Sequence, residues 1–148
     1  MKKRYAVIAA FAGIAMLAGC GGADVSYMDG TYEARSAEYI NEDGSEEGNG
    51  YGVVTVTIKD GAIADCTFRT YELDGTVKGE DYGMKSGSIA NKDFYNKAQK
   101  AVGACEKYAE QLVLAGSVDG VDAISGATIN YRQFVEAADA ALAQAEQK

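Results

Sequence analysis

A run of alternating apolar and polar residues from Gly52 to Lys59 constrains the fold most strongly. Two-residue spacing of apolar side chains is typical of a β-strand with one buried face. Asp60-Gly61 follows at once, a dipeptide that favours a tight hairpin turn, and Ile63 to Tyr71 continues the alternation. The apolar positions of this pair are Val54, Val56, Ile58, Ala64, Cys66 and Phe68. The sequence therefore predicts an antiparallel hairpin whose apolar face must be covered by other elements.

A shorter alternating segment precedes the hairpin. Residues Thr31 to Tyr39 carry small or apolar side chains at every second position, which predicts a further strand. The acidic, glycine-rich segment from Asn41 to Gly50 is typical of an exposed loop. The three strands together predict an antiparallel meander.

The second half of the chain has helical spacing. Lys92 to Leu114 predicts a helix with Asn91 as its N-cap and Gly116 just past its end. A last helix is expected to start at Asn130, with Gln133 completing a capping box. The apolar positions are Phe94, Ala98, Val102, Cys105, Ala109 and Leu112 in the first helix, and Tyr131, Phe134, Val135, Ala138 and Leu142 in the last. Strands followed by helices predict a single small α+β domain, a β-meander packed against two main helices.

The first nineteen residues are typical of a targeting segment. Met1 to Arg4 is basic, and Tyr5 to Ala18 is an apolar run shorter than the ~20 residues of a membrane-spanning helix. The run ends in Leu17-Ala18-Gly19-Cys20, which resembles a bacterial lipobox. We expect residues 1–19 to be a lipoprotein signal peptide that is removed before a lipidated Cys20. The alternative is an ordinary signal peptide or an uncleaved anchor, in which Cys20 has no role.

In this interpretation residues 20–28 are a lipidated Cys and tether, and residues 29–148 are the folded domain. A lipid anchor attaches a protein to a membrane without spanning it. The nine steps from Cys20 to Asp29 extend to about 30 Å at most, so the domain would lie close to the bilayer. The expected location is the extracytoplasmic face of the cell membrane.

Charge and the absence of His narrow the possible functions. The net charge of −8 becomes −11 when Lys2, Lys3 and Arg4 are removed, which makes nucleic acid and anionic lipid poor partners. Without His, the usual general base, most zinc sites and the commonest haem ligand are missing, so a redox function requires an organic cofactor. Cys66 and Cys105 are too far apart for a Cys-x-x-Cys motif and are either a structural disulfide or two separate buried thiols.

A segment of small residues between the two predicted helices carries the chemical signal. It ends in Ser125-Gly126-Ala127-Thr128 and runs directly into the last helix. The free N–H groups and the dipole of a helix N-terminus favour an anion such as a phosphate. Gly126 and Ala127 leave room for a ligand, and Ser125 and Thr128 add hydroxyl groups. From this local pattern alone, Ser125 and Thr128 are more often simple turn and cap residues.

Asp122-x-x-Ser125-Gly126-Ala127-Thr128 resembles the flavinylation motif of the FMN-binding domain family. That family includes the C subunit of the sodium-translocating NADH:quinone oxidoreductase and the G subunit of the RNF complex. Asp29-Gly30-Thr31-Tyr32, the hairpin from Val54 to Ile63 and Tyr108-Ala109-Glu110 occur in the order seen in small lipoprotein members. The resemblance implies FMN joined to Thr128 by a phosphoester bond, installed by a flavin transferase that uses FAD.

The same resemblance implies an electron carrier with no catalytic residues, rather than an enzyme, with a membrane redox partner as its electron donor. The net negative charge favours a low reduction potential. Two alternatives remain open. One is a lipoprotein that binds FMN or another anionic ligand noncovalently, and the other is a structural surface antigen without flavin.

The chain departs from the family pattern at two places. Many members have a Ser or Thr two residues after the flavinylated Thr, where this chain has Asn130, and Glu80-Asp81-Tyr82-Gly83 stands near the position of a Glu-Thr-Pro-Gly segment. Tyr82 and Tyr131 are candidates to stack on the flavin ring or to hydrogen-bond it, the alternative being half-buried core tyrosines. Asp122 either orients the motif, binds the metal of the transferase or caps a turn.

Overall fold

The computed structural model describes residues 25–146 of the chain. The predicted signal peptide, Cys20 and the first part of the tether lie outside the described residues, so these assignments stay predictions. Among the helices of residues 25–146, none is both long and apolar enough to cross a membrane.

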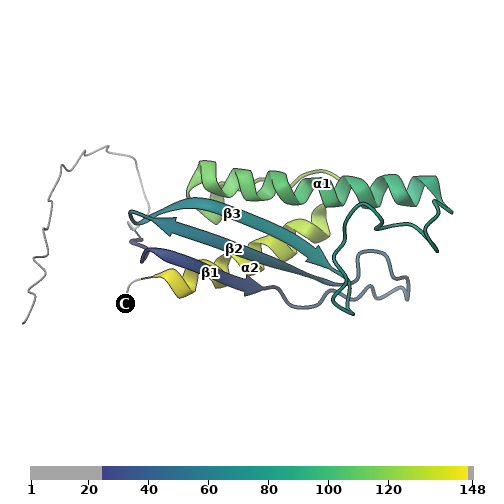
Figure 1. The fold of residues 1–148 in the computed structure, drawn as a ribbon, viewed down its shortest axis with the longest axis horizontal. Helices are drawn as coiled ribbons and strands as arrows, with labels where there is room; N and C mark the ends of the chain where they lie inside the picture. Colours follow the sequence, from purple (N-terminus) through teal and green to yellow (C-terminus); the bar gives the residue numbers. More distant parts are fainter. Residues whose placement is uncertain (1–24, 147–148) are drawn as a thin grey trace, which may run out of the picture.

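The sheet is a three-stranded antiparallel meander (Figure 1). Its strands β1 (Gly30–Arg35), β2 (Tyr51–Lys59) and β3 (Ala62–Tyr71) lie in the order β1-β2-β3, which confirms the predicted topology. Strict alternation in β2 buries every second side chain on the face toward the helices. The two-residue period of the sequence thus sets both the strand and its buried face.

One prediction about β3 is wrong. Thr57 pairs with Asp65 and Ile58 pairs with Ile63, so the register shifts and Ala64 is an extra residue in β3. This β-bulge leaves Ala64 exposed, whereas Ile63 takes the core position that simple alternation gives to Ala64.

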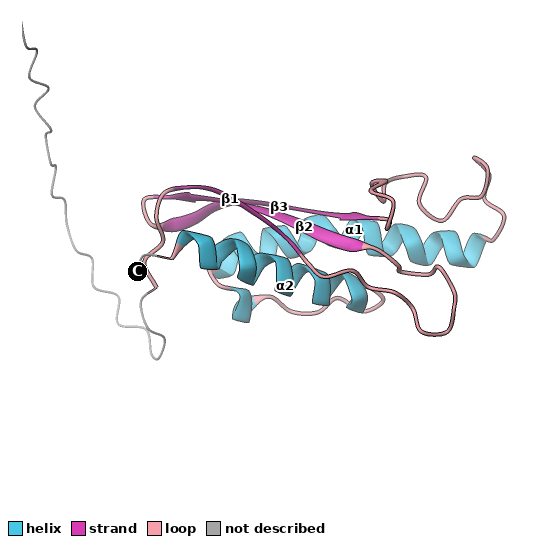
Figure 2. Ribbon diagram, turned by 90° about the horizontal axis from the view of Figure 1, so that it is seen from below, coloured by secondary structure: helices cyan, strands magenta, loops and turns pink. Residues whose placement is uncertain are grey.

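Two helices cover one face of the sheet, and the other face is open (Figure 2). Helix α1 (Lys92–Ala115) packs mainly on β3, and α2 (Thr128–Ala145) packs on β2 and β1. A short 3-10 helix, η1 (Val118–Gly120), lies between them in the chain. The single α+β domain is therefore confirmed. The caps of α1 are as predicted, because the Asn91 side chain accepts from the Phe94 N–H and Gly116 has the left-handed φ of 73°.

The predicted capping box of α2 is wrong. The helix begins at Thr128 after Ala127, which provides no side-chain cap. Asn130 instead donates its side-chain N–H to the Ala101 carbonyl at 3.1 Å, and Gln133 donates to the Gly50 carbonyl at 3.0 Å. Buried and part-buried carbonyl groups need hydrogen-bond donors. Because Asn130 and Gln133 donate to such carbonyls, their side chains do not cap the helix. The first N–H groups of α2 therefore have no capping side chain.

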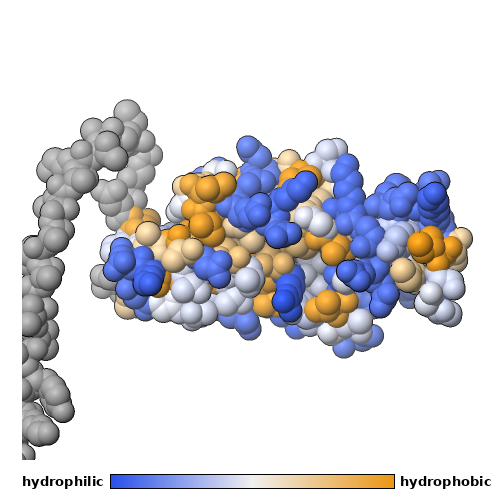
Figure 3. Space-filling model, turned by 45° about the horizontal axis from the view of Figure 1, so that its top comes forward, coloured by the Kyte–Doolittle hydropathy of each residue, from blue (hydrophilic) through white to orange (hydrophobic). Residues whose placement is uncertain are grey.

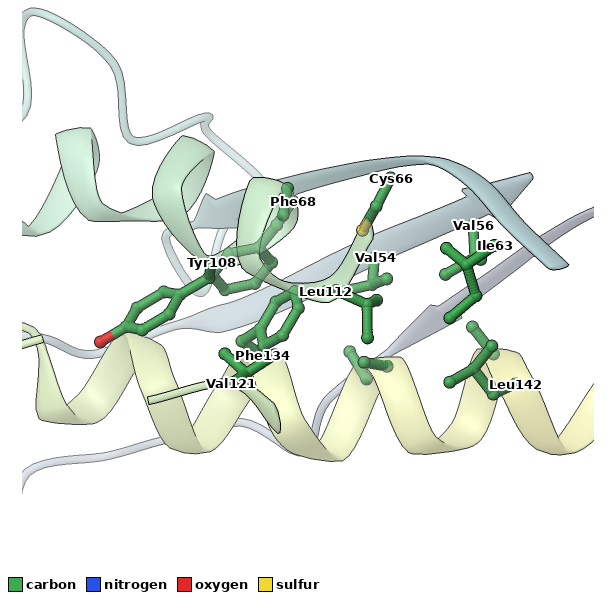
Figure 4. Packing of buried hydrophobic residues seen from close by; sticks show 14 of the residues in the cluster. Val54, Val56, Ile63, Cys66, Phe68, Tyr108, Leu112, Val121, Phe134 and Leu142 are labelled. Carbon is green, nitrogen blue, oxygen red and sulfur yellow. The ribbon is translucent and has the colours of Figure 1, made fainter. Parts of the chain in front are cut away.

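The core lies between the sheet and the two helices (Figure 4). Its largest fully buried side chains are Tyr108, Phe134, Leu112, Val54 and Val56. The Phe134 ring packs edge-on against the Phe68 ring, with 5.1 Å between the ring centres, and stacks on the Tyr108 ring, with 5.7 Å between the centres. This cluster joins α1, α2 and β3 into one unit.

Cys66 and Cys105 are both buried and both free. Of the two possibilities that the sequence leaves open, the structure has separate thiols. Burial raises the pKa of Cys66 from 9.0 to about 12, and burial also raises the pKa of Cys105. Both groups are thus protonated at neutral pH and make poor nucleophiles.

We predict that neither thiol reacts with a disulfide reagent at neutral pH until the domain unfolds. The raised pKa of Cys66 stabilises the folded state below pH 9, and this contribution is lost as the pH rises from 9 to about 12. A Cys66→Ala, Cys105→Ala double variant should keep its flavin content and redox cycling. Thiol titration with and without denaturant checks the first expectation. A folded, flavin-loaded double variant that no longer transfers electrons would contradict the second.

The N-terminal end of the described chain lies beside the end of α2. The Met28 N–H donates to the Ala145 carbonyl at 2.7 Å, and Tyr27 forms an antiparallel bridge with Glu146. Since Thr128 is the first residue of α2, the described N-terminal residues meet the domain at the opposite end of this helix from the motif.

Candidate functional site

Side chains of α1 hold the loop that carries the motif. The Tyr108 side chain is fully buried, and its hydroxyl accepts from the Ile124 N–H at 2.9 Å and donates to the Ala127 carbonyl at 3.1 Å. Further up the loop, the Gln111 side chain accepts from the Asp122 N–H at 2.8 Å. These bonds fix the backbone just before Thr128. Tyr108 is therefore a positioning residue that sequence analysis placed only in a family segment.

We predict that Tyr108→Phe loosens this loop. The Ile124 N–H loses its acceptor, which should cost about 1–3 kcal/mol of stability, whereas the Ala127 carbonyl keeps the bond from the Tyr131 N–H. Covalent flavin loading should slow in proportion to the disorder of the loop. Thermal unfolding and a time course of flavin incorporation measure the two effects.

Tyr131→Phe is the matched control, because it removes one hydroxyl bond, to the Val121 carbonyl, farther from Thr128. Equal loading rates in the two variants would contradict a role for Tyr108 in positioning the motif.

The start of α2 offers free hydrogen-bond donors. The first helical bond runs from the Tyr131 N–H to the Ala127 carbonyl, so the N–H groups of Thr128, Ile129 and Asn130 lie before it. Gly126 precedes them with a φ of 84°, a conformation that favours glycine. Such a helix start favours an anion, and the exposed Thr128 hydroxyl belongs to its first residue.

Lys100 of α1 lies over Gly126. A Cβ atom on Gly126 would stand 3.4 Å from the Lys100 Nζ atom, so this ammonium group is close to the motif backbone. Lys100 is exposed and adds positive charge where a phosphate would bind. The local charge at the motif is thus favourable to an anion although the whole chain is acidic.

A cavity of about 360 Å³ opens beside the start of α2. Its wall comes from the loop before β2, the segment after β3, and the two helices. The lining residues are Glu47, Gly48, Thr70, Lys78, Tyr82, Phe94, Lys97, Ala98, Ala101, Val102, Gly126, Ala127, Thr128, Ile129 and Asn130. A larger cavity of about 790 Å³ lies between β3 and α1, but the motif does not line it. We assign the site to the smaller cavity because it contains Thr128.

Lys78 and Tyr82 line this cavity and both contact Gly48. Lys78 is 8% exposed, and its Nζ donates to the Gly48 carbonyl at 3.2 Å and lies 4.8 Å from the centre of the Tyr82 ring. Burial lowers the pKa of Lys78 to about 8. The Tyr82 hydroxyl accepts from the Gly48 N–H at 3.3 Å, and burial raises its pKa.

Sequence analysis missed Lys78. A lysine in an irregular polar segment is usually exposed, and no spacing marks this one as buried. Its burial depends on the loop around Gly48, which comes from a distant part of the chain.

The structure brings some of the predicted site residues together and separates others. Thr128, Gly126, Ala127 and Tyr82 line the cavity, whereas Ser125 and Asp122 are exposed and do not. Tyr131 does not line it either. The Tyr131 hydroxyl donates to the Val121 carbonyl at 3.1 Å, and its ring lies 5.7 Å from that of Tyr108. Tyr131 is thus a half-buried core tyrosine, the alternative considered for it.

The geometry defines a class of protein. An uncapped helix start with a nearby lysine suits the anionic end of a ligand, and the adjoining cavity has room for the rest of it. Within residues 25–146, no group of three or more His, Cys, Asp or Glu side chains is placed to hold a metal ion. The site therefore fits a phosphate-bearing organic cofactor.

Comparison with known proteins identifies the family. A family model described as FMN-binding domain matches residues 48–143, and the chain belongs to this family. Family membership supports FMN as the cofactor and a flavoprotein of the electron-transfer type. A crystal structure of the CPE2226 protein from Clostridium perfringens shares the fold, with 20% identity, 80% of this chain and 88% of that chain covered, and a TM-score of 0.55. A search of curated proteins found no match.

Proposed function

We propose that the protein is a membrane-anchored electron carrier that holds FMN through a phosphoester bond to Thr128. The observation that carries this proposal is the position of Thr128. It is the first residue of an uncapped helix, it is exposed, and it lines the cavity beside that helix. Its hydroxyl and the free N–H groups are therefore available to the same phosphate.

The residues present fit this cofactor. The N–H groups at the start of α2 and the Lys100 ammonium group would hold the phosphate, and Gly126 gives it room. A volume of about 360 Å³ is within the usual range of small-molecule sites, roughly 300–1,000 Å³. Phe94, Val102 and Ile129 give the cavity apolar contacts for the ring system, and Tyr82 adds an aromatic face.

Bound FMN supplies reversible uptake and release of electrons. The chain itself has to hold the flavin, shield one side of it and set its potential. None of these tasks requires a general base, which is consistent with the absence of His. Maturation requires a flavin transferase, and a membrane redox partner would supply the electrons.

We further propose that lipid on Cys20 anchors the domain to the extracytoplasmic face of the cell membrane. This part of the proposal rests on the apolar run and Leu17-Ala18-Gly19-Cys20. On the face seen in Figure 3, hydrophobic residues of the described part of the molecule lie among hydrophilic ones.

Co-production with a flavin transferase tests the cofactor assignment. The protein should gain the mass of FMN less one water, and its yellow colour should survive denaturation and gel filtration. Colour that is lost on denaturation would favour noncovalent binding of the flavin. A colourless protein made beside a transferase that flavinylates a control substrate would favour the structural surface antigen.

A further inference from the structure

We propose that Lys78 is the residue that sets the potential of the flavin, by placing a buried positive charge against the ring. This inference rests on the proposed function and adds to it a role for a residue outside the motif. Lys78 is the only charged side chain that is buried within residues 25–146. It lines the cavity that contains Thr128.

The ammonium group of Lys78 is held in a fixed position. Its Nζ donates to the Gly48 carbonyl and lies above the Tyr82 ring, so the cation is fixed between a loop and an aromatic face. An ammonium group has three N–H donors, and a single acceptor, the Gly48 carbonyl, is present among the described residues. None of the described carboxylates forms an ion pair with it. Lys78 therefore has donors left for a ligand.

The charged groups around the cavity divide into two sets. Lys100 lies at Gly126 and Lys97 lines the cavity, and both are exposed. Lys100 is thus at the phosphate end, and water and salt weaken the effect of both exposed charges. Lys78 is buried in the lining of the cavity. A buried charge interacts with a neighbouring group much more strongly than an exposed charge does.

The groups that act on Lys78 itself come from several elements. Burial opposes the charged form of Lys78, and Glu72, after β3, favours it; the Cys105 group of α1 adds to this only when it is a thiolate. Glu47, which lines the same cavity, acts on the neighbouring Tyr82 hydroxyl. Burial has the largest effect, so the pKa of Lys78 stays below that of an ordinary lysine.

Reduction of a flavin by two electrons with uptake of one proton leaves the ring with one more negative charge. In a measurement, dithionite or an electrode supplies these electrons. A fixed cation beside the ring stabilises the reduced form, so Lys78 should raise the midpoint potential against the effect of the acidic chain. Linkage makes the effect reciprocal, so reduction should raise the pKa of Lys78.

The sign of the pH dependence follows from this linkage. Burial lowers the pKa of Lys78 to about 8 in the flavin-free protein, and we expect Lys78 to lose its proton in the same region with oxidised flavin, because the oxidised ring is uncharged. With reduced flavin it should keep the proton to a higher pH. Between these two pKa values reduction takes up one extra proton, so the midpoint potential falls more steeply with pH. The extra slope is about 30 mV per pH unit, since a tenfold change in an equilibrium constant corresponds to 29.6 mV in a two-electron couple.

The experiment compares wild-type protein with Lys78→Met and with Lys97→Met, after full flavinylation of each. Lys78→Met keeps the length of the side chain and removes its charge, and Lys97→Met removes an exposed charge from the same cavity. Spectroelectrochemical titration on both sides of pH 8 should give a lower midpoint potential for Lys78→Met and no extra slope. Lys97→Met should lower the midpoint potential much less than Lys78→Met does, because the Lys97 charge is exposed to water and salt. Identical potentials and slopes in Lys78→Met and wild type would overturn the inference.

A measurement on unaltered protein keeps the test independent of the variant. NMR titration of the Lys78 side chain in flavin-free, oxidised and reduced wild-type protein should show the highest pKa in the reduced form. An equal pKa in the oxidised and reduced forms would overturn the inference. Failure of the proposed function has a different signature, because wild-type protein would then gain no covalent flavin at all.

Discussion

Thr128→Ala should abolish covalent flavin completely while the domain remains folded. The Thr128 side chain is exposed, and it makes no hydrogen bond to another described residue. Alanine is also a good helix former, so the variant should lose little stability. The cavity and the free N–H groups remain, but the oxygen that forms the phosphoester bond is gone. Intact-mass measurement and absorbance after denaturation check the loss, and circular dichroism checks the fold.

Ser125→Ala is the matched control for this variant. Ser125 lies in the same loop, is exposed and does not line the cavity, so its removal should at most reduce loading. Peptide mapping of loaded wild-type protein should place the adduct on the peptide that contains Thr128. Denaturation-resistant flavin in Thr128→Ala would show that another residue carries it.

Cys20→Ala should release the domain from the membrane or leave an unprocessed precursor. The lipid chains attached at this residue would supply the membrane affinity, at about 0.8 kcal/mol for each buried CH₂ group. None of the helices of residues 25–146 can replace that anchor. Cell fractionation and mass spectrometry of the mature N-terminus measure the result.

Cys66→Ala serves as the control for this experiment, because Cys66 is a buried core thiol and its loss should leave the protein on the membrane. An unmodified Cys20 in mature native protein would contradict the prediction.

The arrangement of the sheet and helices follows from short-range patterns in the sequence. Alternation in β2, the Asp60-Gly61 turn and the Asn91 cap are local features, and each has the predicted role. The bulge at Ala64 is different, because it depends on how β3 pairs with β2 after the turn. A pattern read along one strand contains no information about such a shift in register.

The candidate site could be predicted only in part from the sequence, for the same reason. The motif from Ser125 to Thr128 stands in one piece of sequence, so a pattern finds it. Its partners come from elsewhere: Tyr108 holds the loop from α1, and Lys78 reaches the cavity from the segment after β3. Asn130 resembles a helix cap in the sequence, but in the structure its side chain donates a hydrogen bond to the Ala101 carbonyl. Contacts between distant parts of the chain determine the roles of these three residues.

The attachment of the N-terminal segment beside Glu146 determines which way the flavin would face. Helix α2 has 18 residues, which corresponds to about 27 Å between that attachment point and Thr128. With the lipid anchor that we propose, an upright domain points its cofactor away from the bilayer. Lying flat would bring the flavin closer, but a mature chain of charge −11 is repelled by anionic lipid headgroups. An electron donor embedded in the membrane would therefore need a portion that extends into the aqueous compartment to meet this flavin.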